Sequence, residues 1–259
     1  MKLTVIASGS TGNCYLLQAK DSALILECGV SLERMLRCYK GAIGNVVGCV
    51  ISHEHRDHAG YASQFAQLGL RIIASPGTLE AIGLKDHRKA RQLRPLTTAL
   101  YGDWKIAAFD VKHDAAAPCG FVIEHPECGK LFFATDTCEI RYNFSGMDLD
   151  HVMIETNYSH EILNRKVGEG KMDTAQAHRV QHSHLACEDA CEWLRSNTGE
   201  HLKTAILVHL SDRNADAQAF RSAMQEVAPF AAVEVAQPGL EIELDRQLPG
   251  IATIKKLSI

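Results

Sequence analysis

The chain has 259 residues, of which 46% are hydrophobic and 22% are charged, so it can bury a sizeable core and is not a disordered tail. The formal net charge of -4 excludes a globally basic nucleic-acid-binding protein, although it leaves room for a local basic patch. The longest apolar runs are only as long as strands, which excludes a transmembrane helix, and we expect no membrane partner.

Length and cysteine content indicate the domain organisation and the compartment. We expect a single domain over residues 1–259, since this length fits one large domain or two small ones. The nine cysteines are scattered and form no Cys-x-x-Cys motif. Because the first ten residues are too weakly apolar for a secretory signal, we expect reduced thiols and a cytoplasmic location. Cys187 and Cys191 would share a helix face, where packing is a commoner explanation than a two-thiolate metal clip.

Short apolar runs rich in Val and Ile, bounded by Gly, Asp or Pro, predict strands along the whole chain. In chain order they cover residues 3–7, 23–26, 46–51, 72–74, 106–111, 121–123, 131–134, 152–154, 204–208, 231–235 and 240–244. Helix-like stretches cover 32–39, 61–68, 77–82, 187–196 and 215–227, the last with Asn214 as a candidate N-cap. Residues 85–97 and 159–173 are typical of long loops. The order favours a sheet-rich α/β fold covered by helices.

One short segment carries four potential metal ligands. Residues 52–60 read SHEHRDHAG and contain His53, His55, Asp57 and His58 in the spacing H-x-H-x-D-H. A strand that ends in a loop can turn the first two toward one centre, and the last two toward a second. Imidazole and carboxylate together suit Zn²⁺, Mn²⁺ or Fe²⁺. Four such residues after a buried strand are a poor fit to an ordinary solvated loop.

Three more candidate ligands follow apolar runs further along the chain. His113, Asp136 and His209 each stand at the C-terminal end of a predicted strand, where the sites of α/β proteins gather. Any one of them alone would be explained as a capped or solvated polar residue. Together with the H-x-H-x-D-H segment they indicate a metal centre.

This combined pattern resembles the metallo-β-lactamase fold superfamily of binuclear hydrolases. The segments IASGSTGNCYLL, HDAAAPCGF, RVQHSHLACEDA and LVHLSDRNAD are similar to its YycJ/WalJ branch, which is associated with nuclease activity. The resemblance implies an α/β fold of the αββα four-layer type, with two mixed sheets face to face, helices outside and metals at one edge.

The resemblance also implies two divalent metal ions, Zn²⁺ or Mn²⁺, and a role for each ligand. The first ion would be held by His53, His55 and His113. The second would be held by Asp57, His58 and His209. Asp136 and a hydroxide would bridge the two ions. As a mechanistic hypothesis, we expect Asp57 and Asp136 to orient the hydroxide and Asp57 to accept its proton.

Glu155 and His184 resemble a pair in ribonuclease Z that is thought to deliver a proton to the leaving oxygen. A carboxylate beside an imidazole raises the pKa of the imidazole and fixes its tautomer, so His184 could act as a general acid. Two alternatives remain: His182 could be the active residue, or His184 could be a surface residue next to a helix.

Substrate contacts are expected at the opening loop and after His209. Ser10 and Asn13 lie in a Gly-Ser-rich loop whose backbone N–H groups can approach an anion. Arg213 completes a His-x-Ser-x-Arg segment similar to that of ribonuclease Z-like enzymes, although a salt bridge with a nearby aspartate is an equal alternative. Residues 85–94 carry five basic residues and one acid, which fits either a nucleic-acid track or a solvated face.

We therefore expect a binuclear metal-dependent phosphodiesterase, in particular a nuclease similar to 5′–3′ DNA exonucleases that uses a metal-bridging hydroxide. DNA is favoured over RNA as the partner. A glyoxalase II-like thioesterase, a small or cyclic phosphodiester hydrolase and a non-enzymatic metal-stabilised scaffold remain alternatives. The sequence departs from the common family pattern at Glu27 and Cys138, where Asp and Gly are usual. It leaves the oligomeric state open.

Overall fold

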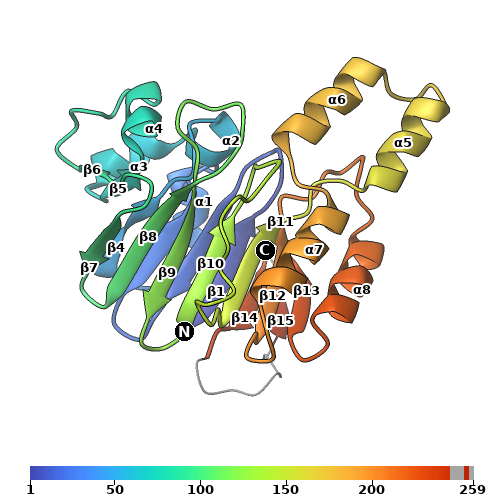
Figure 1. Cartoon of the computed structure of the whole chain (residues 1–259). Helices are drawn as coiled ribbons and strands as arrows, with labels where there is room; N and C mark the ends of the chain where they lie inside the picture. Colours follow the sequence, from blue (N-terminus) through green and yellow to red (C-terminus); the bar gives the residue numbers. More distant parts are fainter. Residues whose placement is uncertain (246–253, 257–259) are drawn as a thin grey trace.

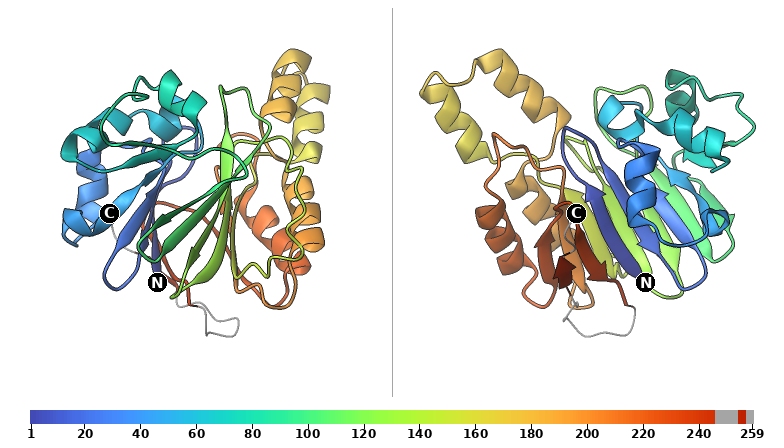
Figure 2. Two further views of the ribbon diagram at one scale, coloured as in Figure 1. Left: turned by 60° about the vertical axis from the view of Figure 1, so that its left-hand side comes forward. Right: turned by 180° about the vertical axis from the view of Figure 1, so that it is seen from behind.

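The computed structural model describes residues 1–245 and the backbone of residues 254–256. Two β-sheets lie face to face, and helices cover the outer face of each (Figure 1, Figure 2). Both sheets are mixed, since each joins antiparallel to parallel strand pairs. The four layers confirm the predicted αββα sandwich.

The first sheet has the strand order β15-β14-β1-β2-β3-β4-β5-β6. Its strands are β1 (Lys2–Ala7), β2 (Cys14–Gln18), β3 (Ala23–Leu26), β4 (Val46–Val50), β5 (Ile72–Ala74), β6 (Ala90–Gln92), β14 (Leu240–Glu243) and β15 (Ile254–Lys256). The second sheet has the order β13-β12-β11-β10-β9-β8-β7. Its strands are β7 (Thr98–Tyr101), β8 (Trp104–Asp110), β9 (Cys119–His125), β10 (Gly129–Ala134), β11 (His151–Glu155), β12 (Thr204–Val208) and β13 (Ala232–Val235).

The helices divide between the two sheets. The first sheet is covered by α1 (Leu32–Cys38), α2 (Arg56–Ala59), α3 (Ala62–Leu68) and α4 (Pro76–Ala81). The second is covered by α7 (Cys187–Asn197) and α8 (Ala217–Val227), while α5 (His160–Gly168) and α6 (Thr174–Ser183) form a hairpin that extends away from the sheets (Figure 1). A short 3-10 helix spans Ile43–Asn45.

The structure corrects three local predictions. Residues 159–173 contain helix α5, which is capped by the Ser159 side chain; its only buried residue is Leu163, so the apolar signal is weak. Residues 85–97 contain the short edge strand β6, whose polar sequence resembles a loop. The N-cap of α8 is Asp216, which accepts from the N–H of Ala219, and not Asn214.

Alternation of side chains explains how the sheets build the core. In β10, Leu131 and Phe133 point between the two sheets, whereas Phe132 and Ala134 point outward under α7 and α8. Both faces of the central strands are therefore buried, which is why these strands appear in the sequence as continuous apolar runs.

The sheet topology brings the predicted ligands to one edge. Strands β3 to β6 are parallel, as are β10 to β13, and the carboxyl ends of parallel strands meet at the same edge of a sheet. The segments after β4, β8, β10 and β12, together with the last residue of β11, carry the candidate ligands and Glu155. They therefore come together between the two sheets at the edge where α2 and α6 lie (Figure 1).

Two further findings bear on the early expectations. Within the described residues, no helix is long and apolar enough to cross a membrane. All nine cysteines lie among the described residues and carry free thiols, and Cys38 and Cys138 are the two that are not buried.

Candidate metal centre

Three groups of potential ligand atoms meet at Asp136. Within each group, the atoms lie within 4.8 Å of one another. The groups are His53, His55, His113 and Asp136; Asp57, His58, Asp136 and His209; and Asp136, Glu155, His184 and His209. The structure thus brings together all seven ligands proposed from the sequence, and it places the proposed acid pair beside them.

The loop after β4 explains how four neighbouring residues serve two groups. His53 lies in the loop and His55 is the N-cap residue of α2, so both precede the helix. Asp57 and His58 are in the helix itself. The change from strand to helix turns the first pair of side chains toward one group and the second pair toward the other.

The first group offers a buried nitrogen with no hydrogen-bond partner among the described residues; Oδ2 of Asp136 lies 3.8 Å from it. Nδ1 of His53 lies 2.9 Å from Oγ of Ser52, but its Nε2 is buried and has no hydrogen bond. His113 donates from Nδ1 to the Ser183 carbonyl at 2.7 Å, which leaves its Nε2 as a lone pair 3.1 Å from Nδ1 of His55. A buried nitrogen without a partner is costly, so the convergence of these atoms fits a bound cation.

The second group combines imidazoles with carboxylates. Oδ2 of Asp57 lies 3.3 Å from Nε2 of both His58 and His209. Oδ1 of Asp136 lies 3.3 Å from Nε2 of His58 and 3.1 Å from Nδ1 of His209. Burial opposes the charged form of Asp136, but His209 and His58 outweigh it and hold the pKa of this carboxyl well below its usual range. A mixed set of nitrogen and oxygen ligands suits Zn²⁺ or Mn²⁺.

Left-handed backbone occurs at three residues of the centre. Asp136 has φ 41°, His209 has φ 55° and Glu27 has φ 64°, and the described residues hold only two further non-glycine residues with positive φ. Such conformations cost about 1–3 kcal/mol each and persist where the surrounding structure enforces them. Here each one turns a side chain from a strand end into the space between the sheets.

Glu27 and Gly29 position the second group from the side opposite its ligand atoms: Glu27 lies beside His58, and Gly29 lies against the backbone of Asp57. Oε1 of Glu27 accepts from the N–H of Ser52 at 3.1 Å, and Oε2 lies 3.6 Å from Nδ1 of His58. A Cβ on Gly29 would lie 1.7 Å from the carbonyl oxygen of Asp57. The longer glutamate therefore reaches His58 in place of the usual aspartate, while the glycine allows α2 to approach.

A buried hydrogen-bond chain links the opening loop to both sheets. The N–H of His209 donates to Oγ of Ser8 at 3.0 Å, and Ser8 lies 2.8 Å from the hydroxyl of Tyr15. Tyr15 donates to Oδ1 of Asn13 at 3.3 Å, and Nδ2 of Asn13 donates to the Asp57 carbonyl at 3.2 Å. The sequence analysis did not identify Ser8 and Tyr15 as neighbours of the candidate centre, since nothing in their spacing marks them.

Glu155 connects His184 to His209. Its Oε1 lies 2.7 Å from Nδ1 of His184 and 3.2 Å from Nδ1 of His209, while Oε2 accepts from the N–H groups of Thr137 and Leu185 at 2.9 and 3.1 Å. Burial lowers the pKa of His184, but Glu155 outweighs it and the net pKa is raised. The His184 side chain is 22% exposed, so its Nε2 is the end that can meet a substrate.

His182 occupies a different position from His184. It lies on the exposed surface of α6, stacks on His178 with ring centroids 3.8 Å apart, and bonds through Nδ1 to the His178 carbonyl. It belongs to none of the three ligand groups within the described residues. Of the two histidines considered from the sequence, His184 is the one that reaches the centre.

The three candidate substrate contacts differ in exposure. Ser10 is exposed at the tip of the opening loop. Asn13 is fully buried and engaged by protein partners, so it positions Asp57 and offers no free group to a substrate. Arg213 is exposed, and in the described part of the chain its guanidinium forms no ion pair with Asp212 or Asp216.

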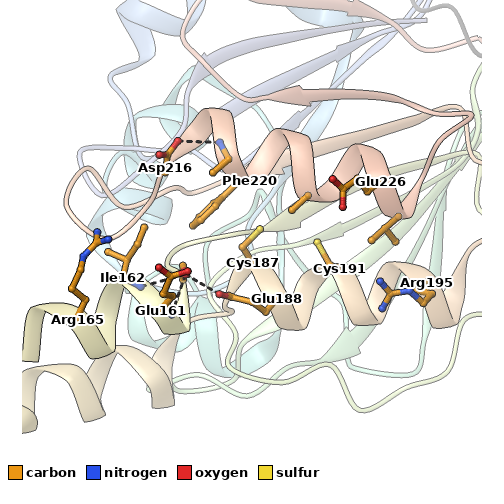
Figure 3. Close-up of a pocket in the computed structure, with 14 residues that line it drawn as sticks. Glu161, Ile162, Arg165, Cys187, Glu188, Cys191, Arg195, Asp216, Phe220 and Glu226 are labelled. Atoms are coloured by element: carbon orange, nitrogen blue, oxygen red, sulfur yellow. Dashed lines mark hydrogen bonds between the residues drawn. The ribbon is translucent and has the colours of Figure 1, made fainter. Parts of the chain in front are cut away.

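A cavity of about 830 Å³ lies between α5, α7 and α8, and none of the ligand residues lines it (Figure 3). Cys187 and Cys191 point into it from one face of α7 (Figure 3). No third ligand accompanies them in a metal-binding group of the described residues. Both cysteines are buried, and their thiols line this cavity beside α8.

Comparisons with known proteins agree with this fold and site. The family model of the beta-lactamase superfamily domain matches residues 26–210. The chain belongs to this superfamily, in its metallo-β-lactamase form, and is a metal-dependent hydrolase.

Within the superfamily the chain is similar to named exonucleases. It is 28% identical over 225 residues to exodeoxyribonuclease WalJ of Streptococcus pneumoniae serotype 2, with 82% of each chain covered. It is 27% identical over 239 residues to exodeoxyribonuclease YycJ of Bacillus anthracis, covering 88% of this chain and 89% of that protein.

Solved structures show the shared fold. YhfI of Bacillus subtilis, a metallo-β-lactamase fold protein, has a TM-score of 0.72 at 20% identity and covers 93% of this chain and 99% of its own. The short form of human tRNase Z has a TM-score of 0.64 at 15% identity and covers 94% and 99%.

Proposed function

We propose that the chain is a binuclear metal-dependent phosphodiesterase that degrades DNA as an exonuclease. The observation that carries the proposal is the Glu155–His184 pair. Glu155 is fully buried beside the ligand groups, whereas His184 is 22% exposed and its Nε2 has no hydrogen-bond partner in the described residues. Similarity to proteins named exodeoxyribonucleases over more than four-fifths of the chain supports the choice of DNA.

Seven residues would hold two ions, Zn²⁺ or Mn²⁺. His53, His55 and His113 would hold one, and Asp57, His58 and His209 the other, with Asp136 between them. When bound, two divalent ions would lower the pKa of a water molecule and neutralise the negative charge that develops on a phosphate during cleavage.

The protein's own groups position the attacking water and protonate the leaving group. Asp57 is the most exposed ligand carboxylate, with 24% of its side chain accessible, so it can orient the water and accept its proton. Glu155 accepts from Nδ1 of His184 and keeps that nitrogen protonated, so Nε2 is the atom that donates to the departing sugar oxygen. A thiolate leaves without such help, which is why the pair favours a phosphodiester over a thioester.

We also propose that the chain forms a single domain and works in the cytoplasm. Strand β14, near the C-terminal end, pairs with β1 at Lys2 and Glu243, which supports the proposal of a single domain. The nine free thiols support the proposal that it works in the reducing cytoplasm.

A substrate panel tests the proposal. Metal-reconstituted protein, loaded with Mn²⁺ or Zn²⁺, is given a labelled 5′-phosphorylated DNA duplex, the matching RNA, a cyclic dinucleotide and a glutathione thioester. We expect progressive loss of nucleotides from the 5′ end of the DNA. Hydrolysis of the thioester or the cyclic dinucleotide without DNA cleavage, by protein with both metal sites filled, would contradict it.

A further inference from the structure

The connection between the two sheets carries arginines that have no carboxylate partner. Edge strand β6 and the segments on either side of it expose Arg88, Arg91 and Arg94. In the described part of the chain, none of the three lies within ion-pair distance of a carboxylate, whereas the nearby Lys85 pairs with Glu80 at 3.0 Å. These three arginines therefore form a locally positive region on a chain whose net charge is -4.

The same connection exposes two leucines. Leu96 is 72% exposed and Leu100 is 71% exposed, the two highest values among the exposed large hydrophobic residues described. Leu96 also has φ 61°, a left-handed backbone that favours glycine over leucine. A strained and solvent-exposed leucine two residues after Arg94 gives the fold nothing that glycine would not, so it points to a contact with another molecule. We call Arg88, Arg91, Arg94, Leu96 and Leu100 the crossover surface.

Strand register relates this surface to the metal centre. Val50 of β4 pairs with Ile73 of β5, and Ile73 pairs with Arg91 of β6. His53 and Arg94 each lie three residues beyond these partners, past the ends of β4 and β6, so both follow the carboxyl edge of the same sheet. Two strand spacings separate β4 from β6 by about 10 Å. That corresponds to about three phosphates along one strand of a duplex.

We propose that the crossover surface binds the phosphodiester backbone of the nucleic acid whose end lies in the metal centre. The guanidinium groups contact phosphate oxygens, which they match in charge and in planar geometry. Leu96 packs against a sugar or base beside those phosphates. This inference rests on the proposed nuclease function and adds the surface by which a long substrate would be distinguished from a small one.

The arginines are tested by duplex binding over a range of salt concentrations. The probe is a phosphorothioate DNA duplex, which resists hydrolysis, and the variant is Arg91→Gln with Arg94→Gln. We expect the affinity to fall about tenfold per arginine and the slope of log K against log salt to shrink by about 1 per arginine. The control is Arg195→Gln on α7, an exposed arginine that pairs with Glu192 and should bind like the wild type.

Leu96→Gly gives a second, independent readout. Glycine relieves the left-handed strain, so the melting temperature should rise while duplex binding weakens. A merely structural leucine would not move the two quantities in opposite directions. The comparison variant is Leu100→Thr on the crossover surface. Threonine keeps the strand propensity of this position, so duplex binding should weaken while the melting temperature does not rise.

The outcomes separate this inference from the proposed function. If the wild type degrades DNA and the double variant binds the duplex with the same affinity and salt slope, the crossover surface is not a substrate surface and the nuclease function stands. If the wild type hydrolyses neither DNA nor bis(p-nitrophenyl) phosphate with its metals bound, the proposed function fails and the inference with it. If sedimentation shows an oligomer that the variants dissociate, the surface is an interface between copies and the inference is overturned.

Discussion

The two sheets supply candidate ligands to the centre in different ways. The first sheet provides four ligands within six residues, from one loop and the first turn of α2. The second provides single residues from separate strand ends, and Asp136 and His209 there adopt left-handed backbone. The first contribution is local and follows from spacing. The second depends on the register of strands that are distant in sequence, and on strain that the surrounding structure must enforce.

The difference teaches where the centre is vulnerable. A loop that carries its own ligands can lose one and keep the others in place. Asp136 belongs to all three ligand groups, so no other residue can replace its carboxylate. The close packing of Gly29 against the Asp57 carbonyl, which lets the loop after β4 approach, likewise has no substitute. The following four changes test this contrast, from the largest expected effect to the smallest.

Replacing Asp136 should have the largest effect. Asp136→Asn removes the charge shared by all three groups, so we expect loss of at least one bound metal equivalent and a fall in turnover of about 10³-fold or more. Metal content by elemental analysis and DNA digestion measure the two effects. Asp110→Asn, at a partly exposed carboxylate bonded to Tyr142, is the control. Full metal occupancy in the Asp136 variant would refute its place in the centre.

Replacing His184 should separate chemistry from metal binding. His184→Gln keeps a polar side chain but removes the acid, so turnover should fall by about 10²–10⁴-fold while metal content stays the same. His182→Gln, two residues earlier on the surface of α6, should leave both unchanged. Loss of metal from the His184 variant would make that residue a ligand and end its assignment as a proton donor.

Adding one methyl group at Gly29, which packs against the loop after β4, should weaken metal binding by the four candidate ligands of that loop. In Gly29→Ala the new Cβ would lie 1.7 Å from the Asp57 carbonyl oxygen, which is backbone and cannot rotate away. We expect a loss of about 3 kcal/mol of stability and weaker metal retention. Gly44→Ala, where nothing lies within 4 Å, should be neutral or slightly stabilising. Equal melting temperatures for the two variants would contradict the close approach of α2.

Removing the hydroxyl of Tyr15 should have the smallest effect. Tyr15→Phe breaks the chain from Ser8 to Asn13 and should cost about 1 kcal/mol of stability. Tyr39→Phe breaks one hydrogen bond to the Ala42 carbonyl and should cost a similar amount. Only the Tyr15 variant should release metal faster to a competing chelator. The same release rate in both would show that the chain does not bear on the centre.

The residue pattern predicted a sheet-rich α/β fold, and the family resemblance implied the αββα sandwich. The candidate ligands were easier to identify than the groups that orient them. The H-x-H-x-D-H segment is visible because its ligands are close in sequence, and His113, Asp136 and His209 follow recognisable strands. His113, however, is oriented by the carbonyl of Ser183, and any residue could supply a carbonyl. The left-handed backbone at Asp136 likewise has no signature in residue type, since it arises from packing.

The α5–α6 hairpin was not predicted for a related reason. Helix α5 buries only Leu163, and α6 buries only Ala177 and Ser183 among the described residues. Both helices extend away from the sheets (Figure 2). Because they bury so few apolar residues, the apolar periodicity that identifies α8 is too weak here.

Helix α6 and the turn before it should tolerate changes in length very differently. Ser183 orients His113, and the next residue is His184, so both depend on where α6 ends. One residue added within α6 rotates everything after it by about 100° and advances it by about 1.5 Å. The exposed turn formed by residues 169–173 positions no residue of the candidate centre. Insertions acquired during divergence should therefore accumulate in that turn, where the hairpin can lengthen and meet new substrates while the chemistry is preserved.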